Sequence, residues 1–183
     1  RNCAIAGSVA VCENGNYYNR FYFVYPDGAV QHYDKKHLFT FGGEHKRFTA
    51  GTERVVVNFR GVRILLEVCY DLRFPVWARN LGDYDMILYV ASWPTPRVDA
   101  WSALLRARAI ENQCYVAGVN RMGVDPACEY SGGSAIIDPY GKTIAECPWS
   151  RESAVSADID MEALQAFRKK FPVLDDADPF TLI

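Results

Sequence analysis

The second half of the chain alternates apolar runs of strand length with one segment of helix length. Residues 86–90, Met-Ile-Leu-Tyr-Val, are apolar without interruption, which is typical of a strand buried on both faces. Residues 99–112 then place apolar side chains at helical spacing, and residues 114–119 return to an apolar run. Strands that alternate with helices predict an α/β layered domain.

The remaining segments extend this pattern over most of the chain. Further strands are expected where β-rich or alternating runs occur, at 3–11, 18–25, 29–33, 55–59, 62–68, 134–137 and 154–159. The turn signals at 26–28 and 60–61 predict hairpins, and the polar, glycine-containing stretch 40–52 predicts a long loop of functional interest. Two more helices are expected at 75–81 and 161–170. We expect a single domain over residues 1–183, with a C-terminal tail at 172–183.

Composition and charge exclude several classes of protein. Half of the 183 residues are hydrophobic, so the chain is not a disordered tail. The formal net charge is -2, and the chain lacks the basic stripe that a nucleic-acid-binding protein needs. Charged residues interrupt every apolar run, and the first residues lack the pattern of a signal peptide. We therefore expect no nucleic-acid or membrane partner.

The cysteines indicate a reducing compartment. They are scattered at 3, 12, 69, 114, 128 and 147, in a chain large enough to fold without disulfides. No Cys-x-x-Cys pair occurs, and the three histidines have no zinc-ligand spacing. Free thiols in the cytoplasm are the simpler interpretation, with most of them inert in the core.

Cys69 lies where the apolar run 62–68 ends and a turn begins. A nucleophile at such a place is lifted out of the backbone at a sharp corner, and the next N–H, that of Tyr70, can point at a developing oxyanion. A cysteine after a strand is also a common core residue, so this motif alone leaves both interpretations open.

Two further segments carry groups that a cysteine nucleophile can use. A buried lysine near a thiol lowers its pKa and binds an oxyanion, and Lys35 and Lys36 lie together in an otherwise apolar turn. Glu44 is the one carboxylate of the loop 40–52. Taken singly, the lysines fit a solvated basic pair and the glutamate fits an ordinary exposed side chain.

Taken together and in this order, these segments resemble the motifs of the nitrilase, or carbon–nitrogen hydrolase, superfamily. Residues 33–39 resemble its lysine motif, residues 68–75 its cysteine motif, and residues 43–51 the loop with its supporting glutamate. The resemblance runs from residue 1 to about residue 171. Within the superfamily, three stretches are most similar to bacterial omega-amidases, at 69–77, 91–97 and 108–113.

The resemblance implies a fold and a chemistry. The fold would be the nitrilase-type α-β-β-α sandwich, of which this chain covers the C-terminal larger part. The reaction would remove the terminal amide of a small carboxylate-bearing amide such as 2-oxoglutaramate and release ammonia. Cys69 would be the nucleophile, with Lys35, not Lys36, stabilising the oxyanion. The backbone N–H of Tyr70 would complete the oxyanion hole, and Glu44 would support the lysine. The reaction needs a small amide and water, and no metal or organic cofactor.

One part of the family's site has no counterpart here. The family's general base is a glutamate upstream of the lysine motif, after a Phe-Pro pair. Glu13 is the only glutamate before Lys35, and its turn does not match. We therefore expect an N-terminally truncated or incompletely represented polypeptide. A non-catalytic binding or assembly subunit with the nitrilase fold is the alternative from another class.

Substrate binding is less constrained by the sequence. A free carboxylate on the substrate needs a cationic partner, and Arg97 is our candidate, with Trp93 as a wall of the pocket. A solvent-facing loop arginine is the alternative for Arg97. Arg73 is expected to pair with Asp71 or with a helix end.

Three further expectations follow. Arg108 and Glu111, three apart on the expected helix, should form a structural pair. Hydrolysis of N-carbamoyl amino acids or of nitriles stays open as an alternative activity in the same superfamily. Superfamily members resemble one another in forming dimers, which implies a homodimer or larger homo-oligomer, with the short helix after Cys69 at the interface.

Overall fold

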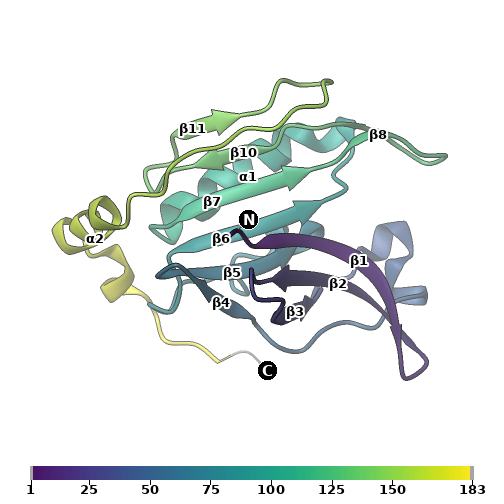
Figure 1. Cartoon of the computed structure of the whole chain (residues 1–183), viewed down its shortest axis with the longest axis horizontal. Coiled ribbons are helices and arrows are strands. Elements are labelled where there is room, and N and C mark those ends of the chain that lie inside the picture. Colours follow the sequence, from purple (N-terminus) through teal and green to yellow (C-terminus); the bar gives the residue numbers. More distant parts are fainter. Residues whose placement is uncertain (1, 182–183) are drawn as a thin grey trace.

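The computed structural model describes residues 2–181 and contains two stacked β-sheets with a helix on the outer face of the larger sheet (Figure 1). The larger sheet has the strand order β11-β10-β7-β6-β5-β4, and the smaller sheet has the order β1-β2-β3. The strands of these two sheets are β1 (Ile5–Glu13), β2 (Asn16–Val24), β3 (Val30–Asp34), β4 (Val56–Phe59), β5 (Val62–Val68), β6 (Met86–Ala91), β7 (Tyr115–Asn120), β10 (Ala135–Ile137) and β11 (Thr143–Glu146).

The helices and a short hairpin complete the described chain. The hairpin pairs β8 (Met122–Val124) with β9 (Glu129–Ser131). The α-helices are α1 (Val98–Glu111) and α2 (Met161–Lys170). Five short 3₁₀ turns are η1 (Thr40–Gly42), η2 (Glu44–Lys46), η3 (Cys69–Arg73), η4 (Thr95–Arg97) and η5 (Val173–Asp176).

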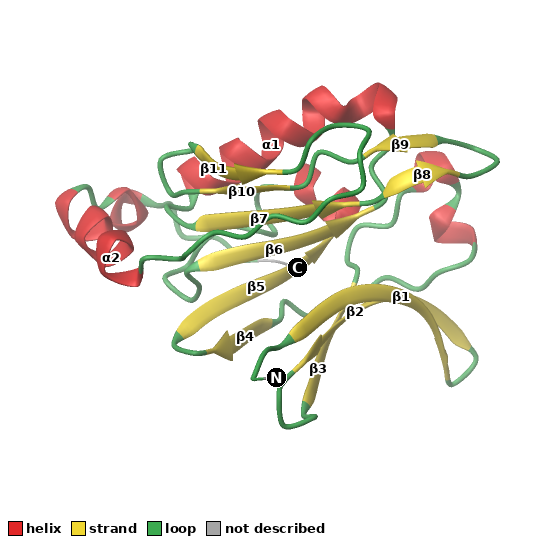
Figure 2. Ribbon diagram, turned by 45° about the horizontal axis from the view of Figure 1, so that its top comes forward, coloured by secondary structure: helices red, strands yellow, loops and turns green. Residues whose placement is uncertain are grey.

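The helix α1 covers one face of the larger sheet (Figure 2). Its buried side chains Trp101, Leu105 and Ala109 are four residues apart, so they form one stripe along the helix. They pack in one cluster with Leu65 of β5 and Ile87 of β6. This confirms the helix that the periodicity of 99–112 predicts.

The smaller sheet covers the opposite face (Figure 2). Phe21 and Phe23 of β2 pack in a second cluster with Ile64, Leu66 and Val68 of β5. Alternate residues of β5 therefore face different layers, and both layers are apolar. Apolar side chains therefore occur on both sides of β5, although Arg63 and Glu67 interrupt its sequence. The arrangement confirms the predicted α/β sandwich, of which the described residues supply one helical layer and two sheets.

Three parallel strands form the centre of the larger sheet. β5 pairs with β6, and β6 with β7, in parallel register. The carboxyl ends of parallel strands meet at one edge of a sheet, where ligands bind in many α/β folds. The turn after β5 begins at Cys69, and the segment after β6 leads into η4 and α1. The turn at Cys69 and the segment that leads into η4 therefore lie at the same edge of the sheet.

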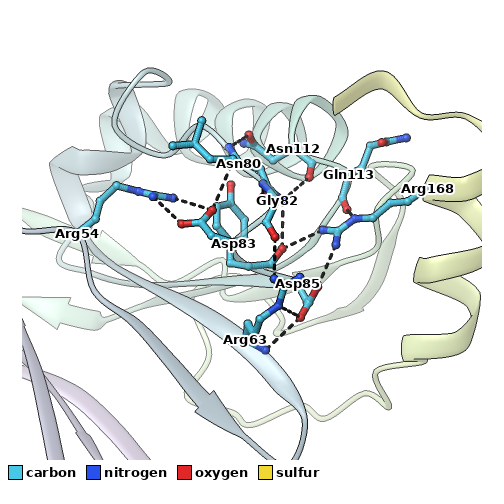
Figure 3. Close-up of polar contacts among 11 residues, drawn as sticks. Arg54, Arg63, Asn80, Gly82, Asp83, Asp85, Asn112, Gln113 and Arg168 are labelled. Carbon is cyan, nitrogen blue, oxygen red and sulfur yellow. Dashed lines mark hydrogen bonds and ion pairs between the residues drawn. The ribbon is translucent and has the colours of Figure 1, made fainter. Parts of the chain in front are cut away.

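A buried aspartate stabilises the other end of these strands (Figure 3). Asp85 precedes β6 and accepts hydrogen bonds from Nε and Nη2 of Arg63, at 2.9 and 2.7 Å. Its Oδ1 also accepts a bond from Nη1 of Arg168 in α2, at 2.9 Å. The two guanidinium groups hold the pKa of Asp85 below its ordinary value against the opposing effect of burial. This cluster fastens α2 to the amino ends of the central strands.

Two element predictions are wrong. No helix forms at 75–81, because the N–H of Asn80 donates to Oδ1 of Asn112 at 2.9 Å and the N–H of Gly82 donates to Oδ1 of Asn80 at 2.9 Å. These side chains take up backbone donors that a helix would use. Residues 154–159 are not a strand either, since within residues 2–181 they join no sheet ladder. The strands β8, β9 and β11 were not predicted from the sequence.

Several other features bear on function. The predicted tail at 172–183 begins with η5, and residues 182–183 lie outside the described part of the chain. All six cysteines are free thiols. Within the described residues, no helix is both long and apolar enough to cross a membrane. In the same part of the chain, no three His, Cys, Asp or Glu side chains gather as a metal site.

Candidate active site

A cavity of about 240 Å³ opens at the carboxyl ends of β5 and β6. Cys69 lines it at the end of β5. The charged side chains that line it are two acid–base partners, Lys35 and Glu44, and two arginines, Arg73 and Arg97. Segments far apart in sequence therefore bring a thiol, an ammonium, a carboxylate and two guanidinium groups to one small space.

Cys69 occupies a strained turn. Its φ is 50°, in the left-handed region that a non-glycine residue adopts at a cost of about 1 kcal/mol or more. The turn lifts the half-buried side chain toward the cavity, and its Sγ lies 3.9 Å from the carbonyl oxygen of Ser92. Burial raises the pKa of the Cys69 thiol, and the nearby ammonium of Lys35 acts in the opposite direction. The sharp corner predicted from the sequence is confirmed.

Lys35 is held rigidly beside the cavity. It follows β3 directly and is only 3% exposed. Its backbone N–H donates to the carbonyl of Asn19 at 3.0 Å, and its carbonyl accepts from Gly51 at 2.9 Å. Residue 51 must be glycine for this approach, because a Cβ there would lie 1.9 Å from the carbonyl oxygen of Asp34. The side chain therefore extends from a backbone that is fixed on both sides.

Glu44 holds the ammonium of Lys35. Its Oε2 accepts from Nζ of Lys35 at 2.6 Å and from the backbone N–H of Phe39 at 2.6 Å, while Oε1 accepts from Nδ2 of Asn19 at 3.1 Å. Burial raises the pKa of Glu44, but Lys35 and the hydrogen bonds outweigh it, so the pKa lies below its ordinary value. Glu44 is thus an anion that holds the side chain of Lys35 in place.

Two arginines line the cavity, and each lies over an aromatic ring. The guanidinium of Arg97 lies 5.4 Å from the ring centre of Phe39, and that of Arg73 lies 4.9 Å from the ring centre of Trp93. The indole N–H of Trp93 donates to the carbonyl of Arg97 at 2.7 Å. Among the ion pairs within residues 2–181, neither guanidinium has a carboxylate partner. Both are therefore available to an anionic ligand.

Comparison with known proteins identifies the family. The family model described as carbon-nitrogen hydrolase matches residues 1–169. The chain belongs to the carbon-nitrogen hydrolase family. It is 53% identical over 182 residues to omega-amidase YafV of Escherichia coli (strain K12), covering 99% of this chain and 71% of that protein. It is 42% identical over 175 residues to a 2-oxoglutaramate amidase of Bacillus subtilis (strain 168), covering 94% of this chain and 67% of that one.

A solved structure shows the same fold. The CN-hydrolase superfamily protein XC1258 of Xanthomonas campestris, which has an arsenic adduct in its active site, matches with a TM-score of 0.96 and 47% identity. The match covers 99% of this chain and 71% of that structure. The nitrilase-type fold expected from the sequence is therefore confirmed.

The carbon-nitrogen hydrolase motifs converge as the sequence resemblance implies. The cavity is lined by all six of the residues proposed from the sequence, namely Cys69, Lys35, Glu44, Tyr70, Trp93 and Arg97. The ring of Tyr70 packs between Phe39 and Phe74, with centroids 5.0 and 5.1 Å away. This packing fixes the position of Tyr70, whose backbone N–H is the first after Cys69 along the chain. The chemical roles of these residues remain predictions.

The structure corrects the expectation for Arg73 and confirms another pair. Arg73 does not pair with Asp71, because the Asp71 carboxylate is buried among other donors, whereas Arg73 is exposed and lies over Trp93. Arg73 is the last residue of η3, which agrees with the other expectation, a helix end, and its side chain also lines the cavity. The predicted pair of Arg108 and Glu111 forms, at 2.7 Å.

The general base of the family has no counterpart among the residues at the cavity. Glu13 instead pairs with Arg20 at 3.0 Å and does not line the cavity. Of the described residues that line it, Glu44 is the only carboxylate. Ser8 and Asn19 also line it and were missed, since nothing in the local sequence of β1 and β2 marks a site.

Proposed function

We propose that this carbon-nitrogen hydrolase is an omega-amidase that removes the terminal amide of small carboxylate-bearing amides such as 2-oxoglutaramate. The observation that carries the proposal is that Cys69, on its strained turn, and the buried Lys35 line one small cavity with two unpaired arginines. The names of the relatives, an omega-amidase and a 2-oxoglutaramate amidase, support the same substrate class.

The first step is attack of the Cys69 sulfur on the amide carbon. The carbonyl π electrons move to oxygen and form a tetrahedral oxyanion. The ammonium of Lys35 and the backbone N–H of Tyr70 stabilise this charge. Glu44 keeps Lys35 oriented, since its carboxylate accepts from the ammonium at 2.6 Å. The oxyanion then collapses, the C–N bond breaks, and nitrogen leaves as ammonia with the thiol proton.

The second step is hydrolysis of the thioester. Water adds to the same carbon, the same donors stabilise the second oxyanion, and the C–S bond breaks to give a carboxylic acid and the free thiol. The net reaction is amide plus water to acid plus ammonia. Each step also requires a proton carrier. Glu44 is an unsuitable carrier, because its oxygens are engaged by Lys35, Phe39 and Asn19.

The arginines account for the preference for a carboxylate at the far end of the substrate. A guanidinium recognises a carboxylate through paired, charge-assisted hydrogen bonds. Arg97 and Arg73 each lie over an aromatic ring, and this contact restricts the position of each guanidinium group. Trp93 forms a wall of the cavity, with the Arg73 guanidinium over its ring and its indole N–H bonded to the Arg97 carbonyl.

The test of the proposed function is ammonia release from 2-oxoglutaramate by the intact protein and by Cys69→Ala. We expect turnover in the first and none in the second. Turnover that survives Cys69→Ala would disprove the role of the thiol. Carbon dioxide released with ammonia from N-carbamoyl amino acids would instead indicate the carbamoyl-amide branch of the family.

We also propose that the enzyme is a cytoplasmic homodimer. Free cysteines, including the exposed Cys3 and Cys12, suit a reducing compartment. The exposed side chains Val76 and Leu81, 55% and 62% accessible, follow the Cys69 turn and offer an apolar contact for a second copy. Light scattering should give twice the mass of the chain, and Leu81→Asp should shift the mass toward one copy.

A further inference from the structure

The carboxylate of Asp71 is completely buried and fully hydrogen-bonded two residues after Cys69. Its Oδ2 accepts from the hydroxyl of Tyr33 at 2.8 Å and from the backbone N–H of Val68 at 3.0 Å. Its Oδ1 accepts from the backbone N–H of His37 at 2.9 Å and from the His37 ring at 2.8 Å. The ring donates here in the tautomer that carries its proton on Nδ1. Four donors saturate one side chain.

These donors come from both segments that supply the proposed catalytic groups. Tyr33 and His37 flank Lys35 at a distance of two residues on each side, while Val68 precedes Cys69. Asp71 therefore joins the lysine segment to the cysteine turn, although 34 to 38 residues separate its side-chain partners from it along the chain. No other carboxylate within the described residues bridges these two segments by hydrogen bonds.

The partners of Asp71 are themselves immobilised. The hydroxyl of Tyr33 accepts from the backbone N–H of Lys36 at 3.0 Å and from the indole of Trp77 at 3.2 Å. The ring of His37 stacks on Phe74 with centroids 3.8 Å apart and planes 4° from parallel. A buried network in which every member is satisfied holds its members in one arrangement. The relative position of the two segments is thus determined by Asp71 and its neighbours.

The charge of Asp71 works against the thiol. Among the ionised groups that act on Cys69, Lys35 lowers the thiol pKa, whereas Glu44 and Asp71 raise it. A carboxylate kept there for its charge alone would therefore make the nucleophile weaker. Its benefit must come from geometry.

We propose that Asp71 is a positioning residue that holds the ammonium of Lys35 against the sulfur of Cys69. The inference rests on the proposed function, in which both groups act on the substrate. It assigns no contact between Asp71 and substrate. Tyr33 and His37 are the two connections through which Asp71 acts on Lys35.

The test is the pH dependence of Cys69 alkylation by iodoacetamide in the intact protein and in Asp71→Asn. Trypsin releases Cys69 in the peptide 64–73, which contains no other cysteine, so its labelling is measured separately from the other thiols. Removing a negative charge at fixed geometry lowers the thiol pKa. Loss of the Lys35 position raises it. We expect a rise of the midpoint by about one unit, which makes labelling at pH 7 about tenfold slower.

Two further variants keep the result interpretable. Asp85→Asn removes the charge of another buried aspartate, at the opposite end of the strands, and should leave the midpoint unchanged. Tyr33→Phe keeps the carboxylate and removes one donor, so it should raise the midpoint by a smaller amount. It also serves where Asp71→Asn fails to fold. A midpoint that is unchanged or lower in the folded Asp71 and Tyr33 variants would overturn the proposal.

Alkylation needs no amide turnover, so the two proposals fail separately. If the midpoint rises but no amide is hydrolysed, the positioning role stands and the omega-amidase assignment falls. If amides are hydrolysed through Cys69 but the midpoint does not rise, the positioning role falls alone.

Discussion

Two buried aspartates fasten opposite ends of the central parallel strands, and they do so with different donors. At the amino ends, Asp85 lies between the guanidinium groups of Arg63 and Arg168 (Figure 3). At the carboxyl ends, Asp71 is held by His37, a tyrosine hydroxyl and two backbone N–H groups. Asp85 is bound by two guanidinium cations and one backbone N–H, whereas the donors to Asp71 include no guanidinium.

The difference indicates a division of labour. None of Arg63, Asp85 and Arg168 lines the cavity, so the Asp85 cluster stabilises the fold without contacting the proposed catalytic groups. Backbone and ring donors transmit position directly, so the Asp71 network fixes where Cys69 and Lys35 lie. We expect changes at the first region to alter the free energy of unfolding, and changes at the second to alter catalysis.

The largest effect should follow removal of the ammonium at the carboxyl ends. Lys35→Met should lower kcat/KM for 2-oxoglutaramate by about 10²- to 10³-fold, because it removes the main charge that stabilises the oxyanion. The measurement is steady-state ammonia release. Arg63→Met, which removes a cation of the other region, is the matched control. It should leave kcat/KM per folded molecule within about twofold of the wild-type value. Equal losses in both variants would break the comparison.

Removal of the charge at the amino ends should act on stability. Asp85→Asn should lower the free energy of unfolding by about 2 kcal/mol, since Arg63 and Arg168 then lose their shared partner. Urea denaturation measures the change. A drop in kcat/KM of the folded variant, with little change in stability, would contradict the division between the two ends.

The arginines of the cavity should bind the substrate carboxylate. Arg97→Ala should raise KM for 2-oxoglutaramate by about 10- to 100-fold, the value of a charge-assisted hydrogen bond, and leave KM for an uncharged amide nearly unchanged. Arg73→Ala should act in the same direction. A similar rise in KM for both kinds of amide would exclude these arginines from carboxylate recognition.

The smallest effect concerns the ion pair of Lys35 and Glu44. Because the pKa of Glu44 in the folded state lies below its ordinary value of 4.5, its carboxylate stabilises the fold fully above that value and loses the contribution as the pH falls below it. Glu44→Gln should therefore be less stable than wild type by about 1 to 2 kcal/mol at pH 7. The difference in urea midpoints should shrink under acid conditions, and a difference that grows would reverse the sign of this interaction.

The local geometry of the site was predictable where short stretches of sequence determine it. The run 62–68 predicts a strand that ends in a turn at Cys69, and the positive φ of Cys69 confirms the turn. The order of the motifs places Lys35 and Glu44 at the same site. These features depend on neighbours along the chain or on the family resemblance.

The role of Asp71 could not be predicted, because its side-chain partners lie 34 to 38 residues away. The sequence suggested Arg73 as a partner of Asp71, with a helix end as the alternative. The wrong helix at 75–81 has the same origin, since Asn112 captures the N–H of Asn80 from 32 residues away. Side-chain to backbone bonds between distant segments leave no periodic signal in the sequence.

Hydroxylamine trapping tests most directly whether the amide is cleaved through Cys69. With 2-oxoglutaramate and hydroxylamine, we expect wild-type protein to form the acyl hydroxamate at the expense of the acid, with the two products together matching the ammonia released. Cys69→Ala should form neither. Ammonia release by Cys69→Ala, or acid as the sole product of the wild type at saturating hydroxylamine, would contradict the thioester mechanism.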